Sequence, residues 1–263
     1  MKNTLLIAIL SIFSLAAFAQ NEGPIKFLGI PIDGTEAQFA TKLKAKGFRY
    51  NSLYESYKGQ FNGRTVDVYL HTNHDIVDRV YVSFPATTEE NVRQEYNQLL
   101  SQFNNTGKYA DWSFNEEIPA KEDISYEMTV NNKRYQASFS YYDDNRDPYE
   151  AMEALVEIFK DYVSDEQKEI FKKYLAEALD KPKEEVKAIR DRMMAELQEK
   201  GFAQETDAEP DPEKAMAFLV KFLDGMKSLA DGEVWFMIHE KYGRYYIGLY
   251  YDNLHNQAHG EDL

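Results

Sequence analysis

The residues best suited to binding chemistry are aromatic residues that alternate with apolar ones in strand-like segments. The chain has 19 tyrosines, and period-two alternation puts such residues on the strand face opposite the apolar face. Tyrosine and tryptophan combine a large contact area with a hydrogen-bonding tip, which suits a sugar or peptide ligand. Strands also favour aromatic residues for packing alone, so a structural role is the alternative. The candidate ligand-binding residues are Tyr69, Tyr81, Tyr142, Trp235, His239, Tyr246 and Tyr250.

Metal chemistry has two candidate segments. His71, His74 and Asp75 could supply ligands at a turn, but their spacing is permissive and matches no zinc motif. The run 143–147 places oxygen ligands as in a calcium loop, yet Pro148 stands where that loop requires glycine. We therefore predict no metal site, and a capping turn at residues 143–147. No cofactor is predicted.

Nucleophilic catalysis finds little support in the sequence. The chain has no cysteine, and no serine lies in a Gly-x-Ser-x-Gly setting. Carboxylate pairs such as Glu116 with Glu117 could serve a glycosidase, but 45 acidic residues make chance pairs unavoidable. No glycine-rich phosphate loop is present. We predict no catalytic residue, and a protein without catalytic activity is favoured over an enzyme.

The first 19 residues read as a cleavable secretory signal. Lys2 supplies a basic start, an apolar run follows from Leu5 to Leu15, and Ala17-Phe18-Ala19 fits the small-x-small cleavage rule. The apolar run is shorter than a membrane span requires. We expect a periplasmic or secreted protein, cleaved near Ala19, with no integral membrane span.

Composition narrows the class of partner. The formal net charge of −15 opposes binding to nucleic acid. Without cysteine no disulfide can form, so stability must come from the core. A protein or glycan partner remains open, as does the oligomeric state.

The hydrophobic pattern predicts an α+β fold built from two helix-plus-meander units in tandem. In the first unit, residues 20–86, Thr35 and Gln38 form a capping box before a short helix. Three strand signals follow, and Asn62-Gly63 is typical of a tight hairpin turn. The predicted strands are 53–61, 66–70 and 80–84.

The second unit, residues 87–147 and 232–263, repeats this pattern around an insertion. Thr87 and Glu90 are predicted to cap a second helix that ends before Gly107. Alternation then predicts antiparallel strands. From residue 148 to 231 the period becomes helical, which predicts a four-helix insertion. The predicted strands of this unit are 124–130, 135–141, 234–239 and 245–251.

The segment Phe27–Gly34, the helix ending at Gly47-Phe48 and the strand Val80–Pro85 resemble a family of uncharacterised secreted α+β proteins from Bacteroidetes. The resemblance covers about half the chain, and it implies no activity. The architecture is also similar to the β-lactamase inhibitor protein fold and to small barrel-assembly lipoproteins of the bacterial envelope. Those similarities imply binding through a sheet face.

Three hypotheses about function follow from these observations. The first is an exported soluble binding or interaction protein that uses the aromatic sheet face or the helical insertion. The second is an envelope or secreted hydrolase that acts on polysaccharide through carboxylates. The third is a structural envelope protein that dimerises through the apolar fourth helix of the insertion.

Overall fold

The computed structural model describes residues 23–143, 164–178, 183–200 and 212–257. The chain divides into two compact units. The sheet unit contains residues 23–143 and 230–257, and the helical unit contains the described residues between 164 and 229. The signal peptide, most of the calcium-like run and the first predicted helix of the insertion lie outside the described residues.

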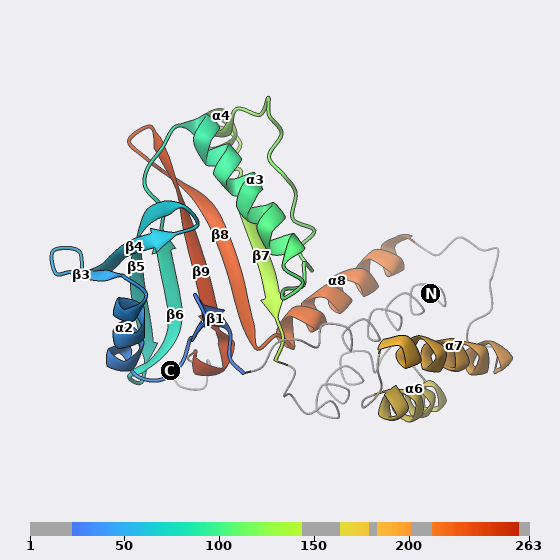
Figure 1. Cartoon of the computed structure of the whole chain (residues 1–263). Helices are drawn as coiled ribbons and strands as arrows, with labels where there is room; N and C mark the ends of the chain where they lie inside the picture. Colours follow the sequence, from blue (N-terminus) through green and yellow to red (C-terminus); the bar gives the residue numbers. More distant parts are fainter. Residues whose placement is uncertain (1–22, 144–163, 179–182, 201–211, 258–263) are drawn as a thin grey trace. The chain divides into compact units, whose positions relative to one another are not determined.

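The sheet unit is built on one antiparallel sheet, in which the described residues form seven strands (Figure 1). Their order across the sheet is β3-β4-β5-β6-β9-β8-β7. The two predicted meanders are therefore halves of a single sheet, joined where β6 pairs with β9. The bounds are β3 Arg49–Asn51, β4 Ser56–Phe61, β5 Arg64–Asn73, β6 Ile76–Ser83, β7 Gln136–Tyr141, β8 Gly232–Lys241 and β9 Arg244–Asn253. A small two-stranded sheet, β1 Lys26–Phe27 and β2 Ile30–Pro31, precedes them.

Tight turns connect the long hairpins. Asn62 and Gly63 both have positive φ, 49° and 73°, as a two-residue turn with mirror-image geometry requires. Tyr242 and Gly243 do the same between β8 and β9, with φ of 54° and 70°. The predicted turn at Asn62-Gly63 is confirmed.

The helices α2 (Glu36–Ala45) and α3 (Glu89–Asn105) begin at threonine caps. The predicted capping box of Thr35 before α2 is confirmed. For α3 the predicted cap is wrong by one residue, because Thr88 accepts the hydrogen bond from the Asn91 N–H. The backbone of Thr87 is already paired with Tyr245, so the sheet fixes it and the helix begins one residue later.

Both helices bury their apolar side chains against one face of the sheet, which we call the inner face (Figure 1). The core joins Phe39 of α2 and Phe103 of α3 to strand residues such as Val82 and Phe236. The opposite face, which we call the outer face, carries the other half of each alternating strand. The α+β class is thus confirmed.

The strand predicted at residues 124–130 is wrong, because Ile124–Thr129 forms a short helix, α4. Asp123 caps it by accepting a hydrogen bond from the Tyr126 N–H at 2.8 Å. Ile124 is buried, but Tyr126 and Val130 are exposed. The alternating apolar residues of this segment therefore do not form one buried face, as they would in a strand. The Asp123 cap favours a helical conformation for this segment over a strand.

The edge strand β7 is protected by the preceding loop. The backbone of Ala110 exchanges two hydrogen bonds of 2.9 Å with Ser140. The Asn115 side chain then imitates a strand: its amide donates to the Ser138 carbonyl and its oxygen accepts from the Ser138 N–H. Asp111 holds Asn115 in place. This loop blocks further strand pairing along β7.

The helical unit contains α6 (Asp165–Ala178), α7 (Lys183–Glu199) and α8 (Pro212–Ser228), where the second, third and fourth helices of the insertion were predicted. Helix α6 begins at a capping box, in which Ser164 and Gln167 hydrogen-bond reciprocally. Ion pairs such as Lys173–Glu196 join α6 to α7. Among the described residues, no helix is both long and apolar enough to cross a bilayer.

The chain leaves the sheet unit for the helical unit between two neighbouring strands. Tyr141 of β7 and Gly232 of β8 are direct cross-strand partners, and the Asp143 N–H donates to Asp231 Oδ2 at 2.8 Å. The described residues of the sheet unit's hydrophobic core all lie between residues 25 and 141 or between 234 and 251. None of them belongs to the helical unit.

We therefore expect that replacing residues 144–229 with a short Gly/Ser linker leaves a sheet unit that unfolds cooperatively. Trp112 and Trp235 are the only tryptophans and both belong to this unit. Urea unfolding followed by their fluorescence and by circular dichroism should give coincident single transitions. A broad transition, or one that differs between the two signals, would show that the helical unit completes the core.

Candidate functional site

Four predicted binding residues form one row across the outer face. Tyr69 of β5 pairs with Tyr81 of β6, Tyr81 with Tyr250 of β9, and Tyr250 with Trp235 of β8. We call this row the aromatic ladder. Each of its side chains is half-buried. Four strands from both predicted meanders thus contribute to one surface.

The ladder rings stack face to face. Trp235 and Tyr250 lie 3.8 Å apart between centroids at an interplanar angle of 6°, and Tyr250 and Tyr81 lie 4.6 Å apart at 17°. Tyr81 and Tyr69 extend the stack at 5.4 Å and 23°. Such contacts add to the stability of a sheet. Because neighbouring ring faces cover one another, the ladder presents ring edges and hydroxyl groups.

A buried ion pair in the next row supports the ladder from one side. Arg79 Nε and Nη2 donate to the two carboxylate oxygens of Asp252 at 2.6 and 2.9 Å. The Trp235 indole N–H donates to Asp252 Oδ2 at 2.9 Å. This hydrogen bonding to Asp252 is the main cause that raises the pKa of Arg79. The Arg79 guanidinium also lies 5.8 Å from the Tyr250 ring centroid, within cation–π range.

On the other side of the ladder, a glycine makes room for a histidine. Gly248 of β9 faces the outer side, and a Cβ there would lie 2.9 Å from His239 Nε2 and 3.0 Å from the Tyr81 ring. His239 stacks on Tyr246, its cross-strand partner, at 4.9 Å and 16°. The predicted residues His239 and Tyr246 therefore adjoin the ladder as a second stacked pair.

Burial changes the acid–base chemistry of this face. It lowers the pKa of His239, whose Nε2 is buried without a hydrogen-bond partner among the described residues. Burial, followed by the neighbouring Tyr81 and Tyr246, raises the pKa of Tyr250 to about 12. Burial likewise raises the pKa of Tyr81. At neutral pH the face therefore presents neutral hydroxyl groups and a neutral imidazole.

The lowered pKa of His239 predicts that acid destabilises the fold. The unfolded imidazole binds a proton more readily than the folded one, so stability is lost as the pH falls through the ordinary value of 6.5 and below. The His239 ring stacks on Tyr246 and lies close to Gly248, as the Tyr81 ring does, and the charged residues Lys133, Arg134 and Glu240 line the pocket beside it. Between about pH 8 and about pH 5, the native protein should lose more unfolding free energy than His239→Phe, which keeps the stacked ring. Urea unfolding at each pH measures this difference, and parallel pH profiles for the two proteins would contradict it.

Tyr142 lies outside the four strands that form the ladder. It follows the end of β7, and its hydroxyl accepts a hydrogen bond from Trp112 Nε1 at 2.9 Å. Arg79, Asp252 and Gly248 are the residues of the site that the prediction missed. The alternation of Arg79 with Val80 and Val82 already places Arg79 on the outer face, but the sequence contains no signal for its pairing with Asp252.

The predicted metal-ligand candidates have structural positions. His71 Nδ1 lies 2.6 Å from Oδ1 of the buried Asp78. His74 and Asp75 form the turn between β5 and β6, where both have positive φ. Within the described ranges, no group of three or more histidine, aspartate or glutamate side chains is arranged to hold a metal ion.

Comparison with known proteins adds no assignment to this geometry. The chain matches no protein-family model, and neither the curated proteins nor the solved structures include a significant match.

Proposed function

We propose that this chain is an exported binding protein without catalytic activity and that its contact surface is the outer face of the sheet. The observation that carries the proposal is the aromatic ladder, a half-exposed stack of four rings on the face opposite α2 and α3. The export step rests on the signal-like residues 1–19. N-terminal sequencing of the secreted protein, with Gln20 as the expected first residue, tests that step.

The composition of the ladder suits a protein partner. Tyrosine, tryptophan and arginine are enriched at the energetic centres of protein interfaces. Here Tyr81, Tyr250 and Trp235 are already fixed by stacking, and Arg79 is fixed by Asp252. Side chains that are ordered before binding lose little conformational entropy on binding. The ladder is therefore a pre-organised contact surface.

The stacking geometry favours a protein over a glycan. A sugar ring packs on an open aromatic face. In the ladder, both faces of Tyr81 and Tyr250 are covered by neighbouring rings, which leaves one face each of Tyr69 and Trp235 outside the stack. Ring edges and hydroxyl groups, by contrast, suit the mixed polar and apolar surface of a folded protein.

The buried carboxylate beside the ladder gives the hydrolase hypothesis no support. Asp252, which lies beside the ladder, is 2% exposed and binds Arg79 through both oxygens. A general acid or nucleophile must instead reach the substrate. Met216 and Val220 are exposed apolar residues of α8. Because a second copy of the chain could cover them, the homodimer hypothesis is tested below as an alternative outcome.

Affinity capture from envelope and culture fractions of a bacterial host tests the proposal. The bait is the protein without residues 1–19, in native form and as Tyr81→Ala/Tyr250→Ala. The matched control, Tyr54→Ala/Tyr242→Ala, removes two exposed tyrosines from hairpin loops instead. We expect a partner that the native protein and the control retain and that the ladder variant loses.

Two results would contradict the proposal. One is a partner that the folded ladder variant retains as strongly as the native protein does. The other is capture of the chain's own copies alone, with a dimer in light scattering that Met216→Glu disrupts. The second result would support the homodimer hypothesis.

A further inference from the structure

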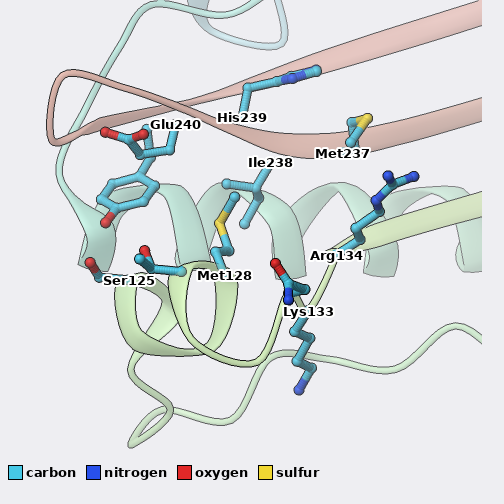
Figure 2. A pocket seen from close by; sticks show the side chains of 11 residues that line it. Ser125, Met128, Lys133, Arg134, Met237, Ile238, His239 and Glu240 are labelled. Atoms are coloured by element: carbon cyan, nitrogen blue, oxygen red, sulfur yellow. The ribbon is translucent and has the colours of Figure 1, made fainter.

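Strand β8 extends beyond β7, and a pocket of about 620 Å³ lies beside its free end (Figure 2). β7 begins at Gln136, opposite Met237, whereas β8 continues to Lys241. Among the described residues, no strand pairs with residues 239–241 on that side. Helix α4 and the turn after it form the opposite wall of the pocket. The pocket therefore occupies the place that a longer β7 would fill.

The backbone of Glu240 faces this pocket. The Ile238 N–H donates to the Tyr135 carbonyl at 3.0 Å, so the backbone groups of Ile238 point to the side of β7. These groups alternate in direction along an antiparallel strand, so the N–H and C=O of Glu240, two residues on, point to the same side. The Glu240 carboxylate accepts a hydrogen bond from the Gly243 N–H in the hairpin turn, away from this edge. The N–H and C=O of Glu240 are therefore available to an added strand.

The opposite wall of the pocket suits the second edge of such a strand. An extended peptide carries hydrogen-bonding groups along both edges, and the edge away from β8 would meet the polar side chains of Ser125, Thr129 and Asn132. Its side chains would alternate between the two sides of the sheet. Met237 lies on one side of β8, and Met128 of α4 lies on the other (Figure 2). Because methionine adapts to varied shapes, each side can accept an apolar side chain.

Charges of both signs line the pocket. Arg134 and Lys133 are basic, Glu240 is acidic, and Lys133 forms an ion pair with Glu122. A small ion of either sign would meet a like charge here. A peptide backbone has no net charge and carries a donor and an acceptor at nearly every residue, so this mixed polar lining suits it better.

We propose that a short extended segment of a partner protein binds in this pocket as an added strand beside β8, in line with β7. Hydrogen bonds to the backbone of Glu240 supply affinity, and the two sides that Met128 and Met237 line select alternate side chains. The free residues 239–241 correspond to about 10 Å of strand at about 3.3 Å per residue, which fits a short segment. The proposal does not rest on the function proposed for the aromatic ladder.

Two substitutions at one position separate the backbone from the side chain. Glu240→Pro removes the N–H that the added strand requires, and the sheet tolerates proline where the N–H faces away from its partner strand. Glu240→Ala loses the same carboxylate but keeps the N–H, so it is the matched control. Both variants should retain the native circular dichroism spectrum. If Glu240→Pro failed to fold while Glu240→Ala folded, the N–H would already belong to the sheet, which would overturn the proposal.

Random peptides displayed on phage are the probe, depleted on immobilised Glu240→Pro and then selected on the native protein. A synthetic copy of an enriched peptide should bind Glu240→Pro at least about fivefold more weakly than Glu240→Ala, because a backbone hydrogen bond is lost. In the complex, hydrogen exchange of the Glu240 amide, followed by NMR, should slow. The absence of any enriched peptide, equal binding by the two variants, or unchanged exchange at Glu240 would each overturn the proposal.

Discussion

Replacing Phe236 with alanine should lower the free energy of unfolding by about 3 to 5 kcal/mol, the range for removing a large aromatic side chain from a core. Phe236 lies in β8 and is 0% exposed. Its ring packs on Tyr96 and Phe103 of α3 at centroid distances of 5.0 and 5.9 Å, and on Phe139 of β7 at 6.4 Å. Alanine would leave a cavity where the helix meets the sheet.

Urea unfolding measures this loss, and the next residue provides the control. Met237 points to the outer face and is partly exposed, so Met237→Ala should cost less than half as much as Phe236→Ala. A one-residue shift in the register of β8 would exchange the faces of these two side chains. Equal losses, or a greater loss for Met237→Ala, would therefore contradict the assignment of the inner and outer faces.

Asp252→Ala should lower the free energy of unfolding by about 3 kcal/mol, at the lower end of the range for breaking a buried ion pair because Arg79 is partly exposed. The substitution leaves the Arg79 guanidinium and the Trp235 indole N–H without their shared acceptor. Both groups border the ladder, so we also expect the fluorescence of Trp235 to change in the folded protein.

The control for Asp252 is Asp67, a half-exposed aspartate on the same face. Lys58 lies 3.7 Å from its carboxylate, and exposed pairs of this kind contribute about 1 kcal/mol or less. Urea unfolding followed by circular dichroism should separate the two variants clearly. If Asp252→Ala were no more destabilising than Asp67→Ala, the buried pair would not be the support of the ladder that the geometry indicates.

Local patterns predicted the elements more reliably than their assembly. Asn62-Gly63 specifies its turn because both residues tolerate positive φ, and alternation correctly separated Trp235 from Phe236. The pairing of β6 with β9 joins Tyr81 to Tyr250, residues separated by most of the chain. Periodicity within each strand contains no information on which distant strand it will meet.

The incorrect strand prediction at Ile124 has a local cause, whereas the missed residues of the site depend on contacts between distant parts of the chain. At Ile124 an aspartate cap and a single buried side chain outweighed an alternating pattern. For the site, outward-facing aromatic residues were predictable one strand at a time, but their common row depends on the register of four strands. The role of Asp252 depends on Arg79, and such a pairing becomes evident only in three dimensions.

Hydroxyl-radical footprinting of the captured complex is the most direct test of the central claim, that the outer face is the contact surface. When the partner is bound, oxidation of Tyr81, Tyr250 and Trp235 should fall together. Tyr242, a hairpin-turn residue that is 92% exposed, should be oxidised as before. Unchanged oxidation of the ladder in a complex that protects other residues would contradict the account.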